Sequence, residues 1–215
     1  MASDRRFGLE NSKSRGILLD AAEQLMREEG YASVTSRRVA TRAELKPQLV
    51  HYYFRTMDDL FLALLQRGAE QNRERLEGAL ASSDPLRAVW ELCSDAQTAA
   101  LSAEFMALAN HRKNIRAEIG RYAEQFRTMQ VTVLSRVLEE SGVDPEVWPL
   151  PAIVFLLESA ARVLVIEKSL GMSTGHAETI GLVKKYQDLL AAARKTRRVK
   201  VRAASPAPRK RKAAA

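Results

Sequence analysis

The chain of 215 residues is 46% hydrophobic and carries a formal net charge of +8, so it is long and apolar enough to bury a real core. The positive charge is concentrated at one end, because residues 194–215 contain ten Lys and Arg and no Asp or Glu. Residues 58–193 have a net charge of −5, and residues 1–57 one of +3. The basic character therefore belongs to the last segment and says little about the folded part.

The sequence gives little sign of secretion or of a membrane span. The single cysteine, Cys93, excludes an intramolecular disulfide, which fits a reducing cytosol. Residues 1–14 lack the apolar segment of a signal peptide. The longest apolar stretch, residues 149–166, is interrupted by Glu158 and Arg162, whereas a transmembrane helix needs about 20 mostly uncharged residues. We therefore expect a cytoplasmic protein that makes no contact with a membrane.

The chain begins with a predicted flexible arm over residues 1–12. A helix is expected over residues 13–29, because its apolar side chains recur at helical spacing and Gly30 follows where a C-terminal cap belongs.

Two short helices come next. Thr35 is a good N-cap for a helix over residues 36–43, and Pro47 suits the first position of a helix over residues 47–54. Because only about three residues connect them, this arrangement is typical of a helix-turn-helix.

The rest of the chain predicts a helical bundle, with neither strand alternation nor an internal repeat. The expected helices cover residues 58–80, 86–101, 103–109, 112–141, 150–170 and 176–193. The fold class is therefore all-α, with about nine helices in two domains. The first is a three-helix helix-turn-helix domain over residues 13–57, and the second is a C-terminal helical bundle over residues 58–194. Residues 195–215 are rich in Arg, Lys, Ala and Pro, which predicts a disordered basic tail.

The segment from Thr35 to Phe61 has the features of a DNA-reading motif. Val50 and Phe54 are four residues apart and can seat the second short helix on the first, with Leu45 beneath them. This leaves five polar or aromatic side chains facing outward, namely Lys46, Gln48, His51, Tyr52 and Tyr53. Arg37 and Arg38 lie just inside the preceding helix, where either can reach a base or a phosphate, and Arg38 can equally be a solvated surface charge.

This segment resembles the DNA-binding domain of the TetR family of repressors over about residues 13–65. The matching residues are Gly30-Tyr31, Thr35, Val39-Ala40, Ala43, Tyr52-Tyr53-Phe54 and Asp58-Asp59-Leu60. The resemblance implies a homodimer that binds double-stranded DNA, and a second domain that holds a small-molecule effector and dimerises through its last two helices. The DNA-binding residues that it implies are Thr35, Ser36, Arg37, Lys46, Pro47, Gln48, His51, Tyr52 and Tyr53. Among these, Thr35 and Tyr53 resemble phosphate contacts, and Arg37, Gln48 and Tyr52 resemble groove-facing residues.

Three positions depart from the family pattern. Family members usually have Gly where Glu44 stands, Thr or Ser where Leu49 stands, and a phosphate-binding Lys where Met57 stands. Met57 cannot neutralise a phosphate, so Arg55 or the basic tail is the alternative source of that contact. Glu44 would mildly repel DNA unless its side chain points away.

The second domain suggests two interaction sites. The helix over residues 150–170 is too apolar to face water, and the helix over residues 176–193 has a matching stripe, so four such helices from two chains would form an interface. The candidate ligand-pocket residues are aromatic, flexible or charged, and they are Trp90, Phe105, Met106, Phe126, Met129, Glu158 and Arg162. The apolar members can equally be core residues, and Glu158 can simply pair with Arg162, four residues away.

Catalytic, metal and cofactor chemistry find little support in the sequence. His51, His111 and His176 lie on different segments without a cysteine or carboxylate at ligand spacing, and no nucleophile motif or phosphate-binding glycine loop is present. We therefore expect no metal, no cofactor and no enzymatic activity. The preferred function is a repressor that a small apolar ligand releases from a palindromic operator. The alternative is a sequence-neutral nucleic-acid-binding protein that acts through its basic tail, with strongly salt-sensitive affinity.

Overall fold

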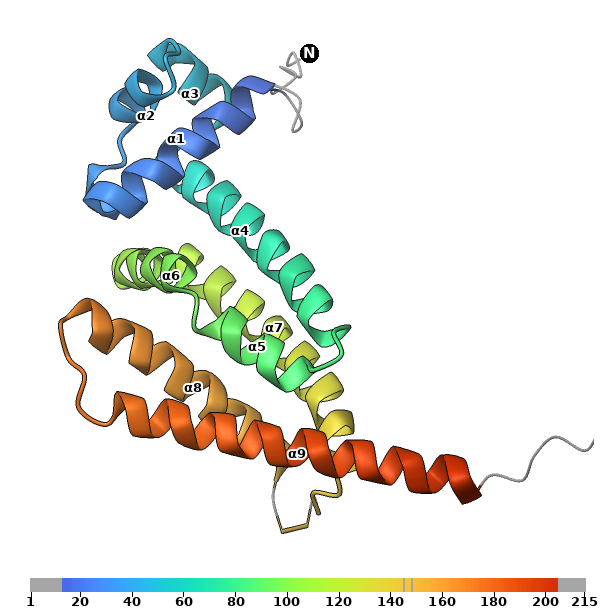
Figure 1. The fold of residues 1–215 in the computed structure, drawn as a ribbon. Coiled ribbons are helices and arrows are strands. Elements are labelled where there is room, and N and C mark those ends of the chain that lie inside the picture. Colours follow the sequence, from blue (N-terminus) through green and yellow to red (C-terminus); the bar gives the residue numbers. More distant parts are fainter. Residues whose placement is uncertain (1–12, 145, 148, 205–215) are drawn as a thin grey trace, which may run out of the picture.

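The protein is described by a computed structural model that covers residues 13–144, 146–147 and 149–204, with side chains placed through residue 197. Every regular element in these residues is a helix, which confirms the all-α prediction of about nine helices (Figure 1). The predicted flexible arm over residues 1–12 and the last part of the predicted tail, residues 205–215, lie outside the described residues.

Nine α-helices and one short 3-10 helix, η1, follow one another in the described residues. Their bounds are α1 Lys13–Glu29, η1 Tyr31–Ser33, α2 Ser36–Arg42, α3 Pro47–Tyr53, α4 Met57–Leu80, α5 Pro85–Cys93, α6 Ala96–Ala109, α7 Lys113–Glu140, α8 Leu150–Ser169 and α9 His176–Ala204. Figure 1 shows α1, α2 and α3 grouped at one end of the molecule, with α4 leading from them to the remaining helices. The antiparallel pair α8 and α9 forms the opposite end.

The three N-terminal helices share their core with neighbouring helices. Their apolar faces pack around the first turns of α4, where Leu60, Phe61 and Leu64 are buried. Two further helices contribute to the same cluster, α6 through Phe105 and α7 through Ile115. Burying these side chains removes apolar surface from water, which is the main favourable term in folding. The core of the N-terminal domain therefore extends past the predicted domain division after residue 57 and includes parts of the second domain.

A second core cluster lies between the end of α4 and helices α5, α7 and α8. Its buried members are Leu76, Leu86, Val89, Leu134, Val137, Leu138, Leu150 and Val154. Because α4 and α7 contribute to both clusters, each of these helices runs from the N-terminal domain to the far end of the bundle.

The break between α5 and α6 corrects the predicted helices over residues 86–101 and 103–109. The chain leaves the helical path at Ser94, and α6 begins after Asp95. The Asp95 carboxylate accepts hydrogen bonds from the backbone N–H of Thr98 at 3.2 Å and from its hydroxyl at 2.5 Å. This N-cap begins a new helix inside the predicted helical span over residues 86–101.

The end of α9 corrects the prediction that the last helix stops at residue 193 and that disorder begins at residue 195. The helix continues to Ala204. Residues 194–204 contain no Gly or Pro, and the Arg, Lys and Ala that dominate them are among the best helix formers. The basic composition therefore extends the helix over these residues.

A hydrogen bond joins the second domain to the turn that follows α1. The Tyr31 backbone N–H donates to the Glu104 carboxylate of α6 at 2.7 Å. Gly30 permits this approach, because its φ of +82° suits glycine and because a Cβ there would lie only 3.2 Å from Glu104 Oε2. The Arg27 side chain donates a second hydrogen bond, from Nη1 to the Gln97 carbonyl oxygen at 2.6 Å.

Removing the Glu104 carboxylate should loosen this junction. We expect Glu104→Ala to lower the free energy of unfolding by about 1.5–3 kcal/mol, because Tyr31 loses a charged acceptor. Glu104→Gln keeps an oxygen at the same place and should lose less than half as much. Urea unfolding of both variants tests this, with Glu124→Ala on the exposed side of α7 as the control. A Glu104→Ala variant as stable as this control would show that the hydrogen bond is unimportant.

Candidate nucleic-acid interface and ligand cavity

Helices α2 and α3 form the predicted helix-turn-helix. Thr35 caps α2, since its hydroxyl accepts a hydrogen bond from the Arg38 backbone N–H at 3.4 Å, and Pro47 occupies the first position of α3. Val50 and Phe54 are buried, as predicted, and half-buried Leu45 packs against the same core. The inner side of α3 is therefore held against the domain, which leaves its other side free for a partner.

The residues predicted to bind DNA lie at the starts of α2 and α3 and along the outer side of α3. Seven of them are exposed, namely Thr35, Arg37, Lys46, Pro47, Gln48, His51 and Tyr52, whereas Ser36 and Tyr53 are half-buried. Tyr53 packs against the core and also meets the Tyr52 ring edge-on, with 5.0 Å between ring centroids and 80° between ring planes. The contact between the two rings restricts where the exposed Tyr52 side chain can point.

The structure distinguishes the two neighbouring arginines of α2. The Arg38 guanidinium is turned back to the end of α1, where it donates to both oxygens of Glu29 at 2.5 and 2.6 Å. Within the residues that the structure describes, the Arg37 side chain forms no ion pair. Arg37 is therefore the arginine at the start of α2 whose charge is available to a ligand, whereas Arg38 connects α2 to α1.

The turn between α2 and α3 explains why the family favours glycine at one position. Glu44 has a φ of +55°, in the left-handed region that costs most L-residues about 1–2 kcal/mol. Its side chain is exposed. The other two departures from the family pattern, Leu49 and Met57, are half-buried and pack against the N-terminal core. Met57 is thus a packing residue at the start of α4.

The comparisons with known proteins identify the family. The model of the family "Bacterial regulatory proteins, tetR family" matches residues 18–64, from α1 to the first turns of α4. Residues 18–64 of this chain form a TetR-family DNA-binding domain. This domain belongs to a family of DNA-binding transcriptional regulators, as the sequence predicted, and that family is not one of enzymes. A search of curated protein sequences found no match.

Solved structures extend the likeness of the TetR-family regulator to the whole fold. A Rhodococcus sp. protein described as a TetR-family transcriptional regulator has a TM-score of 0.64 at 16% identity, covering 86% of this chain and 98% of its own. A transcriptional regulator from Pseudomonas aeruginosa PAO1 has a TM-score of 0.66 at 18% identity, with coverages of 89% and 97%. The fatty acid degradation regulator FadR from Bacillus halodurans has a TM-score of 0.59 at 17% identity, with coverages of 85% and 97%.

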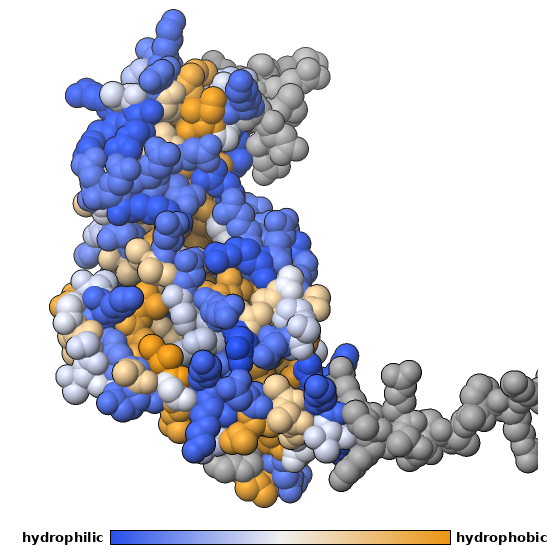
Figure 2. Space-filling model, viewed as in Figure 1, coloured by the Kyte–Doolittle hydropathy of each residue, from blue (hydrophilic) through white to orange (hydrophobic). Residues whose placement is uncertain are grey.

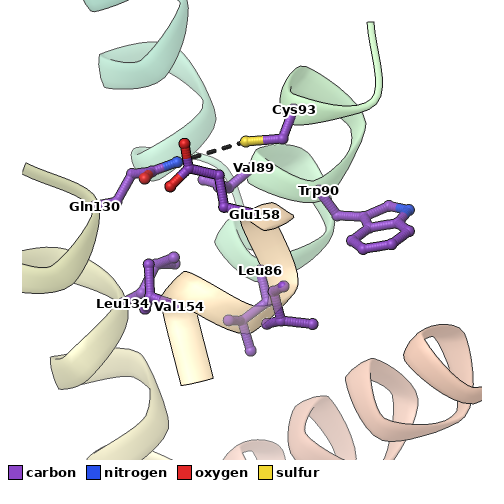
Figure 3. Close-up of a pocket in the computed structure, with 9 residues that line it drawn as sticks. Leu86, Val89, Trp90, Cys93, Gln130, Leu134, Val154 and Glu158 are labelled. Carbon is purple, nitrogen blue, oxygen red and sulfur yellow. Dashed lines mark hydrogen bonds between the residues drawn. The ribbon is translucent and has the colours of Figure 1, made fainter. Parts of the chain in front are cut away.

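The second domain of the regulator contains a small cavity between α5, α7 and α8 (Figure 3). It is lined by Leu86, Val89, Trp90, Cys93, Gln130, Leu134, Val154, Leu157 and Glu158. The space open to the centre of a water-sized sphere is about 20 Å³, which is enough for about one water molecule. A larger ligand would therefore have to displace part of the wall.

The predicted pocket residues are not gathered in one place. Trp90 and Glu158 line the cavity, and Arg162 reaches it only through its ion pair with Glu158. Phe126 and Met129 are half-buried against the second core cluster.

Phe105 and Met106 lie away from this cavity. Phe105 belongs to the N-terminal core, and the Met106 side chain is 60% exposed. The cause is the break at Asp95, which starts a separate helix and directs α6 toward α1. Sequence reasoning missed seven of the nine lining residues, among them the two polar ones Cys93 and Gln130. Gln130 had a usable signal, because it is a polar residue next to Met129 in the apolar stripe of α7.

Polar groups meet at one side of this cavity. The Glu158 carboxylate accepts hydrogen bonds from Arg127 at 3.0 Å and from Arg162 at 2.5 Å. The Gln130 side-chain N–H lies 3.5 Å from the Cys93 sulfur and donates to it. Burial, and to a lesser extent the negative charge of Glu158, raises the pKa of the Cys93 thiol from the usual 9.0 to about 11. The thiol is therefore neutral near pH 7. No group of three or more His, Cys, Asp or Glu suited to a metal ion occurs among the described residues.

The positive φ at Glu44 predicts that Glu44→Gly stabilises the fold. The gain should be up to about 1 kcal/mol, because glycine relieves the left-handed strain but also makes the unfolded chain more flexible. Glu44→Asn should also stabilise, since asparagine tolerates this conformation. Glu44→Gln removes only the charge and serves as the matched control. A gain in urea-unfolding free energy with Gln as large as with Gly would assign the effect to charge and not to conformation.

The raised pKa predicts that Cys93 reacts slowly with iodoacetamide. Because the thiolate is the reacting form, a shift from 9.0 to about 11 should lower the labelling rate by on the order of a hundredfold between about pH 7 and 9. The rate should still rise with pH throughout this range. Ser102→Cys in a Cys93→Ser background places an exposed thiol on α6 for comparison. If mass spectrometry shows that Cys93 and the introduced thiol react at equal rates, the raised pKa of Cys93 is contradicted.

Proposed function

We propose that this TetR-family regulator is a homodimeric repressor that binds a palindromic operator and is released from it by a small ligand. The observation that carries the proposal is the apolar outer face of α8 and α9, because it supplies the two-fold assembly that a palindrome requires. We further propose that the protein acts in the cytoplasm, where its DNA partner lies.

The proposed dimer face consists of large apolar side chains that remain 42–72% exposed in the single chain. On α8 and at its end they are Phe155, Leu156, Val163, Ile166 and Leu170, and on α9 they are Ile180, Leu182, Tyr186 and Leu189. Figure 2 shows apolar side chains on the part of the surface where α8 and α9 lie. The opposite side of α9 is held within the chain, through buried Val183 and through Gln187, which donates to the Leu86 carbonyl at 3.2 Å. A contiguous apolar surface of this kind favours a protein partner, and a second copy offers the same face.

Operator reading is proposed for the exposed residues at the starts of α2 and α3 and along α3. Arg37, Gln48 and Tyr52 would face the major groove, while Thr35 and Tyr53 would contact phosphates, assisted by Ser36, Lys46, Pro47 and His51. In a two-fold dimer the two α3 helices would enter the groove about one helical turn, or 34 Å, apart.

Ligand release is proposed to act through the helices that connect the cavity to the N-terminal core. A ligand can weaken DNA binding only if it favours an arrangement in which the two α3 helices are wrongly spaced. Typical coupling of about 1–3 kcal/mol would lower operator affinity by about 5- to 150-fold. By reciprocity, operator DNA would weaken ligand binding by the same factor.

Selection of binding sites from random DNA tests the operator proposal directly. We expect a palindromic sequence to emerge and to bind much more tightly than random DNA, both for the full chain and for a chain that lacks residues 205–215. If selection yields no consensus, or if binding is lost with this basic segment, the alternative of a sequence-neutral nucleic-acid-binding protein is correct.

Arg37→Ala and Tyr52→Ala should each weaken binding to the selected operator by about 1–3 kcal/mol and blunt the preference at one base pair. The affinity of these variants for random DNA should fall less, because base contacts add little to non-specific binding. Arg38→Ala is the matched control, since its guanidinium is paired with Glu29 and its loss should mainly affect stability. Fluorescence-anisotropy titrations measure both affinities. If Arg37→Ala loses the same affinity for the operator and for random DNA, Arg37 contacts only phosphate.

Leu182→Glu should separate the proposed dimer, because each chain would bury an unpaired carboxylate in the apolar face of α8 and α9. We expect the dissociation constant of the dimer to rise on the order of a hundredfold, the effect of losing a central interface residue. Lys184→Glu introduces the same side chain on another side of α9 and should leave the dimer intact. Analytical ultracentrifugation measures both variants. A wild-type chain that is monomeric at micromolar concentration would refute the proposed assembly.

A further inference from the structure

The cavity between α5, α7 and α8 contains a buried hydrogen-bond acceptor without a partner. Gln130 is 0% exposed, and its Oε1 has no hydrogen-bond partner among the residues that the structure describes, whereas its Nε2 donates to the Cys93 sulfur. A buried polar atom without a partner is unfavourable and rare in folded proteins. Because the Gln130 side chain also lines the cavity, a ligand in the cavity could donate a hydrogen bond to Oε1.

The charges around the cavity restrict what that donor can be. The Glu158 carboxylate already accepts hydrogen bonds from Arg127 and Arg162, so these three groups carry a net charge of +1. A cationic ligand is therefore not needed to neutralise the carboxylate. An anionic ligand would meet the lone pairs of Gln130 Oε1 and of the carboxylate, which are the polar oxygens that line the cavity. The Cys93 thiol is neutral and adds no charge. These groups therefore favour a neutral ligand with an O–H or N–H donor.

The rest of the wall determines the body of the ligand. Six of the nine lining residues are apolar, namely Leu86, Val89, Trp90, Leu134, Val154 and Leu157. Figure 3 shows the Gln130 amide, the Glu158 carboxylate and the Cys93 thiol together at one side, while the Trp90 ring points away from them. Trp90 is half-buried, so its indole is the part of the wall that a ligand can displace toward solvent. The site suits a compact apolar body with a single polar end.

We propose that the effector is a compact, neutral molecule with an apolar, ring-sized body and one hydroxyl or N–H group, which donates a hydrogen bond to Gln130 Oε1. This assignment rests on the proposed function for its regulatory meaning, but the binding site itself can be tested without DNA. Figure 3 shows the Glu158 carboxylate beside the Gln130 amide, so a ligand bound there also places a polar group next to the ion pair that joins α7 to α8.

Three probes of similar shape test the proposal by calorimetric titration of the full chain. Phenol has a donor, anisole has only an acceptor, and toluene has neither. We expect phenol to bind at least about tenfold more tightly than the other two, the effect of one hydrogen bond to an otherwise unpartnered buried group. Gln130→Leu should remove this preference, while the matched variant Gln125→Leu, on the exposed side of α7, should retain it. If Gln130→Leu does not fold, Gln130→Met supplies the same test.

The outcomes separate the site from its regulatory role. Equal binding of phenol and anisole, a preference for anisole, an unchanged preference in Gln130→Leu, or no saturable binding of phenol would each overturn the proposal. Displacement of the selected operator by phenol is measured separately. Selective binding that depends on Gln130 supports the assigned chemistry even when operator affinity does not change, and in that case it is the ligand-release part of the proposed function that fails.

Discussion

The N-terminal core depends on side chains that come from the second domain. Phe105 of α6 and Ile115 of α7 are buried in the same cluster as the apolar faces of α1, α2 and α3. A shift of α6 or α7 therefore changes the packing beneath the helix-turn-helix. Since packed cores respond to such shifts by moving between discrete arrangements, the position of α3 is coupled to the rest of the chain through ordinary side-chain contacts.

Helix α7 connects that shared core to the cavity. Ile115 packs against the N-terminal helices, and Gln130 lines the cavity fifteen residues later, which corresponds to about 22 Å along a helix. Helix α4 makes a parallel connection, from Leu60 in the first cluster to Leu76 in the second. Two stiff helices that span both clusters transmit displacement better than a single one, because they fix orientation as well as distance.

The sequence predicted the fold well where local signals and packing agree. The helix-turn-helix was predicted from Thr35, Pro47 and the apolar pair Val50 and Phe54. Helix caps predicted most of the other helix bounds. The prediction failed at Asp95, where a side-chain cap begins a new helix inside a predicted helical span, and in α9, where charged composition was interpreted as disorder. The cavity was only partly predictable, because Trp90 and Glu158 are brought beside Gln130 by helix packing that no local pattern encodes.

Association through the outer face of α8 and α9 depends on temperature, because the burial of apolar surface is driven mainly by entropy near room temperature and weakens on cooling. The contacts of Lys and Arg with DNA phosphates follow ionic strength instead. A regulator assembled through this face would therefore occupy its operator less fully in the cold at constant salt. If the proposed dimer forms through these side chains of α8 and α9, gene control by this protein would respond to growth temperature.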